Sequence, residues 1–339
     1  ARYYHARAQR DGASDQARQI AFEQAGRYYR RFIEIFPDDP AAPEMHTLLA
    51  DTLYDRGRYQ AAADEYTNAA YNYPPHPRAA DAGYGAVDSY HKWAEAQPTE
   101  ARAEAILVAV DAARRFADNF SEHPEAPRVL TRAAEDLYDL GELEPAAEVA
   151  QRVVDTQPRP DARLRRSSWQ VLGLSRFDQQ RYQDAEAAFK QVLQLTPPDD
   201  TERRQTTRDQ IASAIYRQAE VARDQGRPDD AVAQFLRIGQ EMPDSSIRAT
   251  AQFDAAAVLI ASEQWDHAIE VLQDFRSTFP ADQRQPDVTR KLAAVYLSSD
   301  QPTRAAAEFA RIAGDSAEIA LDHHGAARRL DGIVEVRRH

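Results

Sequence analysis

Residues 57–74 read GRYQAAADEYTNAAYNYP, and the spacing of this stretch recurs along the whole chain. The spacing is Gly-x-Tyr-x2-Ala-x3-Tyr-x2-Ala-x4-Pro. Copies with small, aromatic and apolar residues at the same offsets end on Pro158, Pro197, Pro243 and Pro280, and weaker copies end on Pro37, Pro124 and Ala317. A pattern that fits eight times predicts an array of structural repeats.

The residue types at these offsets indicate a helix face. An alanine, an aromatic residue four positions on and an apolar residue three positions further form the i, i+4, i+7 stripe of a helix. Ala62 would let a neighbouring helix approach closely, and Tyr66 would fill the layer between repeats. Pro74 comes where the chain must leave the helix axis. A second helix with a small residue precedes each turn, so each repeat should be two antiparallel helices.

The pattern resembles the tetratricopeptide repeat. Its W-x2-L-G…Y…A-x3-F…P signature is matched most fully by Trp169, Leu172, Gly173, Tyr182, Ala185, Phe189 and Pro197. The resemblance implies an all-α solenoid of about eight helix-turn-helix repeats that form a right-handed superhelix over residues 1–339. No run of residues alternates as a strand would.

The expected repeats are not uniform. One repeat replaces the short glycine turn by residues 97–100, and we expect an irregular, weak joint at 97–102. Residues 316–337 are expected to form a helix that either caps the array or begins a further repeat. Because the chain begins at Ala1, we also expect it to be a fragment of a longer protein.

Composition narrows the function classes. The 42 basic and 55 acidic residues give a net charge of −13, which disfavours binding to nucleic acid. The absence of cysteine removes disulfides, thiolate nucleophiles and sulfur-ligated zinc. The longest apolar runs are far shorter than the ~20 residues that cross a bilayer, so no membrane span is expected.

Motifs for chemistry are lacking. The adjacent pair His323 and His324 would point to different helix faces, which is unsuited to a metal site. The doublet Gly83-x-Gly85 lies inside an expected helix without a preceding strand, so a phosphate-binding role is disfavoured. We therefore predict a non-catalytic protein with no cofactor and no metal.

The resemblance implies that the first helix of each repeat lines a concave groove that binds a partner. The predicted groove residues are Asp51, Tyr54, Asp55, Tyr84, Asp88, His91, Glu135, Tyr138, Asp139, Phe177, Tyr216 and Phe253. The groove should change from acidic and aromatic to more apolar along the chain. The alternative, that many of these side chains serve packing or are idle surface, stays open.

These observations predict a protein–protein interaction scaffold whose partner segment is basic and apolar. A self-assembling structural module, and thus a homo-oligomer, is the alternative. The family's Lys/Arg and Asn clamp for chain ends of chaperones has no match at the groove positions. Residues 243–253 and 275–280 look like repeats of bacterial envelope proteins, such as the lipoprotein of β-barrel assembly and the Tol/Pal-associated periplasmic protein. This implies a periplasmic or outer-membrane-associated location, with a cytoplasmic one as the alternative.

Overall fold

The computed structural model describes residues 1–8 and 14–314, and every regular element in these ranges is a helix. The chain forms two compact units, residues 1–181 and residues from 182 onward. The helices of the N-terminal unit are α1 (Arg2–Ala8), α2 (Asp15–Ile35), α3 (Ala42–Tyr54), α4 (Tyr59–Tyr71), α5 (Ala79–Glu95), α6 (Thr99–Asn119), α7 (Ala126–Asp139), α8 (Leu143–Asp155) and α9 (Ala162–Asp178). Those of the C-terminal unit are α10 (Tyr182–Leu195), α11 (Thr201–Asp224), α12 (Pro228–Glu241), α13 (Arg248–Ala261), α14 (Trp265–Thr278) and α15 (Gln285–Ser298), followed by helical residues 302–314.

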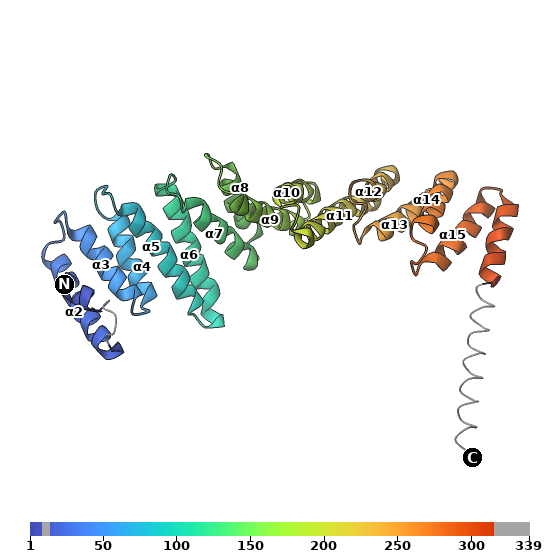
Figure 1. Cartoon of the computed structure of the whole chain (residues 1–339). Helices are drawn as coiled ribbons and strands as arrows, with labels where there is room; N and C mark the ends of the chain where they lie inside the picture. The colour runs from blue at the N-terminus through green and yellow to red at the C-terminus, as the bar shows by residue number, and fades with distance from the viewer. Residues whose placement is uncertain (9–13, 315–339) are drawn as a thin grey trace, which may run out of the picture. The chain divides into compact units, whose positions relative to one another are not determined.

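Within each unit, consecutive helices pack against each other as antiparallel hairpins (Figure 1). The helices α3, α5, α7, α9, α11, α13 and α15 are the first helices of their repeats. The predicted helix-turn-helix fold is thus confirmed. The single solenoid over the whole chain stays a prediction, and the expected helix at 316–337 lies outside the described residues.

The repeat positions form the core. The aromatic residues at the pattern's central offset, Phe116, Phe189, Phe235 and Phe275, are at most 1% exposed. Ala62 and Ala185 at the preceding offset are fully buried. A Cβ added at Gly85 of α5 would lie 3.1 Å from the ring of Tyr66 of α4. The doublet Gly83-x-Gly85 therefore serves close helix packing.

The tight turns share one backbone conformation. Gly57, Gly141 and Gly226 have φ angles of +69°, +80° and +71°, in the left-handed region that glycine adopts at low cost. Three repeats place Gln180, Glu263 and Asp300 in the same region. The repeats that lack the glycine therefore form the same turn between their two helices.

One turn is shorter than predicted. Residues 97–100 were expected to form the turn, but α6 begins at Thr99, directly after the N-cap residue Pro98. Arg102 closes the turn by donating to the carbonyl oxygens of Glu95 and Gln97 at 3.4 and 3.2 Å. The weak joint proposed for 97–102 stays a prediction.

Candidate partner-binding face

The candidate site is a surface that we call the first-helix face. It consists of the side chains that the first helices α3, α5, α7 and α9 direct away from the second helices. Tyr54 of α3 donates to Oδ2 of Asp88 of α5 at 2.6 Å. Tyr138 of α7 donates in the same way to Asp178 of α9 at 2.9 Å. The first helices α3 and α5, and likewise α7 and α9, are therefore joined by tyrosine–aspartate hydrogen bonds.

The bond has a counterpart in the C-terminal unit, where Tyr216 of α11 donates to Asp254 of α13 at 2.6 Å. Burial, and then the aspartate that accepts the bond, raise the pKa of these tyrosines, to about 12 for Tyr138. Their hydroxyls are thus neutral donors at neutral pH.

The predicted residue Asp51 also has a partner within the chain. Tyr66 of α4 donates to its Oδ1 at 2.5 Å, and burial and this bond raise the pKa of Tyr66. Asp51 consequently links the two helices of one repeat, and this oxygen is already used.

Three other acidic residues predicted for the groove are exposed to solvent. Asp55 and Asp139 are exposed, and within the described residues their carboxylates form no hydrogen bond or ion pair. Glu135 is exposed too. Asp55 caps the C-terminal end of α3 and Asp139 is the last residue of α7, where the helix dipole is also negative.

His91 lies beneath the first-helix face instead of on it. It is only 5% exposed, and its Nδ1 lies 3.6 Å from Oδ2 of Asp136 of α7, too far for a hydrogen bond. Neither His91 Nε2 nor Asp136 Oδ2 has a hydrogen-bond partner in the described structure. Burial lowers the pKa of His91 to about 4 and raises that of Asp136 to about 6.

The aromatic residues predicted for the groove differ in their contacts within the chain. Tyr84 packs against Phe116 of α6 and stacks on His123, with ring centroids 6.2 and 6.1 Å apart. Phe253 packs against Phe275 in the C-terminal unit, and Phe177 of α9 is half-buried. In the N-terminal unit, Tyr54 and Tyr138 are the predicted tyrosines that join first helices.

Sequence reasoning missed the acceptors Asp178 and Asp254 and the half-buried Asp136. The pairs Tyr54–Asp88, Tyr138–Asp178 and Tyr216–Asp254 are separated by 34, 40 and 38 residues. A tyrosine followed by an aspartate about one repeat later is therefore a signal that could have found two of these acceptors.

No group of three or more histidine and acidic side chains is placed to hold a metal ion in residues 1–8 and 14–314. In the same part of the chain, no helix is long and apolar enough to span a membrane.

The family model for the tetratricopeptide repeat matches residues 10–80, 131–200 and 171–246, more than half of the chain. No curated protein matches the sequence.

Similar solved structures include the MamA protein, with 15% identity over 58% of this chain and 96% of that one and a TM-score of 0.35. A tetratricopeptide repeat protein from Parabacteroides merdae has 15% identity over 86% of this chain and 93% of that one, with a TM-score of 0.32. YrrB, described as having an unusual peptide-binding site, has 14% identity over 63% and 99% of the two chains and a TM-score of 0.33.

Proposed function

Because this chain belongs to the tetratricopeptide repeat family, we propose that it is a protein-interaction scaffold that binds a basic, partly apolar partner segment on the first-helix face. The observation that carries this proposal is the placement of unpaired acids at the ends of first helices. Asp55 and Asp139 lie at the C-terminal ends of α3 and α7, and neither helix has a basic residue in its last turn.

Such placement works against helix stability. An acid in the last turn opposes the helix dipole by about 0.3–1 kcal/mol, whereas a lysine or arginine there would stabilise the helix. The negative potential of the carboxylates adds to that of the helix ends and attracts cations. A partner with arginine or lysine would be drawn to this face, and its charges would act on the association rate and on selectivity.

The tyrosines supply the apolar part of the surface. Tyr54 and Tyr138 are half-buried, and their hydroxyls are held by Asp88 and Asp178. Fixed aromatic rings lose little conformational entropy on binding and are frequent at interface hot spots. The partner segment should therefore alternate or combine basic residues with bulky apolar ones.

A selection from a random peptide display library on the full chain tests this proposal. We expect the enriched peptides to carry arginine or lysine next to leucine or an aromatic residue, and to lose affinity for an Asp55→Lys/Asp139→Lys variant. A matched variant, Glu104→Lys/Glu148→Lys, reverses two exposed acids on the second helices α6 and α8. Enriched basic peptides that bind the two variants equally well would contradict the proposal.

We also propose that the scaffold acts in a bacterial envelope assembly, on the basis of the residues 243–253 that resemble envelope repeats. Antibody detection of the native protein in periplasmic, membrane and cytoplasmic fractions tests this location. A protein confined to the cytoplasmic fraction would contradict it. The alternative of a self-assembling module predicts a concentration-dependent increase of mass in light scattering.

A further inference from the structure

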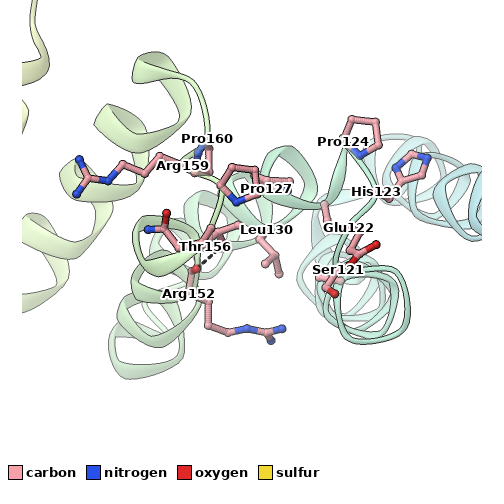
Figure 2. Close-up of a pocket in the computed structure, with 14 residues that line it drawn as sticks. Ser121, Glu122, His123, Pro124, Pro127, Leu130, Arg152, Thr156, Arg159 and Pro160 are labelled. Atoms are coloured by element: carbon pink, nitrogen blue, oxygen red, sulfur yellow. Dashed lines mark hydrogen bonds between the residues drawn. The ribbon is translucent and has the colours of Figure 1, made fainter.

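A pocket of about 710 Å³ lies in the N-terminal unit, between the loop that joins α6 to α7 and the loop that joins α8 to α9 (Figure 2). Leu130, Ala126 and Ala117 contribute apolar lining and are 3–4% exposed. The volume falls within the range of about 300–1,000 Å³ of typical ligand sites. None of the residues predicted for the first-helix face lines this pocket.

The walls of the pocket are stiff. Pro124 and Pro127 line one side and Pro158 and Pro160 the other, and proline fixes its own φ angle. His123, in the first wall, stacks on Tyr84, and its carbonyl oxygen accepts from the backbone N–H of Ala126 at 2.9 Å. A pocket with such walls needs little ordering when a ligand binds.

The charge at the pocket differs from that of the chain. Arg152 and Arg159 both contribute to the lining, and residues 152–166 contain five arginines and two aspartates in a chain of net charge −13. Arg159 is exposed and forms no ion pair in the described structure. Arg152 and Leu130 both line the pocket (Figure 2), and Arg152 is held by Asp118 of α6 at 2.5 Å.

The opposite wall carries the single acid of the lining, Glu122, next to Ser121 (Figure 2). The two walls therefore differ in charge. An acidic ligand group would be favoured on the side of Arg152 and Arg159 and disfavoured on the side of Glu122. This difference would orient an asymmetric ligand.

We propose that this pocket binds an extended segment of a partner protein in which a carboxylate side chain neighbours a bulky apolar one. The apolar side chain would cover Leu130, and the carboxylate would pair with Arg159 and with free N–H groups of Arg152. Such a segment has the opposite charge to the one proposed for the first-helix face. The pocket is therefore a second, independent binding site.

The probe is the peptide GSLELESG, added to the chain of residues 1–339 with ¹³C-labelled leucine methyl groups and followed by NMR. We expect the Leu130 methyl signals, assigned with a Leu130→Met variant, to shift in a saturable way. The dissociation constant should rise at least tenfold in Arg159→Glu and fall about twofold in Glu122→Gln. Arg163→Glu, which reverses an exposed arginine outside the pocket lining, should change it less than twofold.

Three outcomes would overturn the proposal. The first is a peptide that leaves the Leu130 signals in place at millimolar concentration. The second is equal weakening by Arg159→Glu and Arg163→Glu, which would indicate non-specific charge attraction. The third is equal binding of a GSLKLKSG peptide, which would show that the arginines do not select a carboxylate. Unchanged circular dichroism of each variant excludes misfolding as the cause of lost binding.

Discussion

The junction between α3 and α5 and the junction between α5 and α7 are neighbours in the N-terminal unit, but they are built differently. The first is closed by the hydrogen bond from Tyr54 to Asp88 at 2.6 Å. The second brings His91 and Asp136 to 3.6 Å, without a hydrogen bond between them. The second junction is also bridged by an ion pair, in which Arg132 of α7 donates to Glu95 of α5 at 2.8 Å. The first junction thus uses a neutral donor and a carboxylate, and the second combines an exposed ion pair with two less exposed groups that both titrate.

The difference shows that a polar residue on a first helix can either bond to a neighbouring helix or remain available to a partner. Tyr54 and Asp88 are bonded to each other, so their polar atoms serve the repeat junction. His91 and Asp136 form no hydrogen bond with each other. His91 is buried and Asp136 is half-buried, with its Oδ2 4.0 Å from Nε of Arg132, and burial shifts the pKa of both groups. Asp55 and Asp139 form no such contact, which leaves them available to a partner.

The largest expected effect is a change of stability with pH at the junction between α5 and α7, where His91 and Asp136 titrate. The pKa of His91 is lowered from 6.5 to about 4, so the unfolded chain takes up this proton first and stability falls as the pH falls from 6.5 towards 4. The pKa of Asp136 is raised from 3.8 to about 6, so its protonation in the folded state raises stability as the pH falls from 6 towards 3.8. In the wild type the two contributions oppose each other.

Replacing either His91 or Asp136 should reveal the contribution of the other residue to the pH dependence of stability. Relative to wild type, Asp136→Asn should lose about 2 kcal/mol between pH 6.5 and 4.5, and His91→Gln should gain a similar amount, since one pKa unit is about 1.4 kcal/mol. Urea unfolding at the two pH values measures this difference. Parallel pH profiles for both variants and the wild type would show that the pair does not titrate in this range.

A smaller effect is expected at the bonded junction. Tyr54→Phe should lower stability by about 1–2 kcal/mol, because the carboxylate of Asp88 loses a donor. The matched control is Tyr59→Phe, since the Tyr59 ring packs against Tyr54 at 5.2 Å and its hydroxyl forms no hydrogen bond within the described residues. This control should change stability by less than about 0.5 kcal/mol. Equal losses in both variants would mean that the bond contributes nothing.

The smallest effect is expected when the titrating pair is replaced by apolar side chains. His91→Leu with Asp136→Leu should be neutral or stabilising by up to about 1 kcal/mol at pH 7, because neither polar group is hydrogen-bonded to the other. Thermal unfolding of the double variant checks this. A loss of more than about 2 kcal/mol would indicate that the pair stabilises the junction after all.

The sequence predicts the repeats well because their offsets record helix packing directly. The residues at the alanine and aromatic offsets, such as Ala185 and Phe189, are buried in the structure as the pattern predicts. The pattern predicts a turn over residues 97–100, but α6 already begins at Thr99 after Pro98. A proline is tolerated just before a first helical turn, where its missing N–H costs nothing.

The candidate site could be predicted only in part. Helical periodicity places Tyr54, Asp88 and Tyr138 on first helices, but it carries no information on contacts between helices. Whether a tyrosine meets an aspartate depends on the length of the intervening helix and loops, and the separation varies between 34 and 40 residues. The burial of His91 likewise depends on how closely α7 packs against α5.

The measurement that tests the central claim most directly is the association rate of the selected basic peptide, followed by stopped-flow fluorescence at 20 and 200 mM salt. We predict that Asp55→Lys/Asp139→Lys lowers this rate at least tenfold at low salt and removes most of its salt dependence. Glu104→Lys/Glu148→Lys on the second helices should have a much smaller effect. Tyr54→Phe should leave the rate within twofold of wild type, because its hydroxyl is already bonded to Asp88. Equal association rates for the two charge-reversal variants would contradict the assignment of binding to the first-helix face.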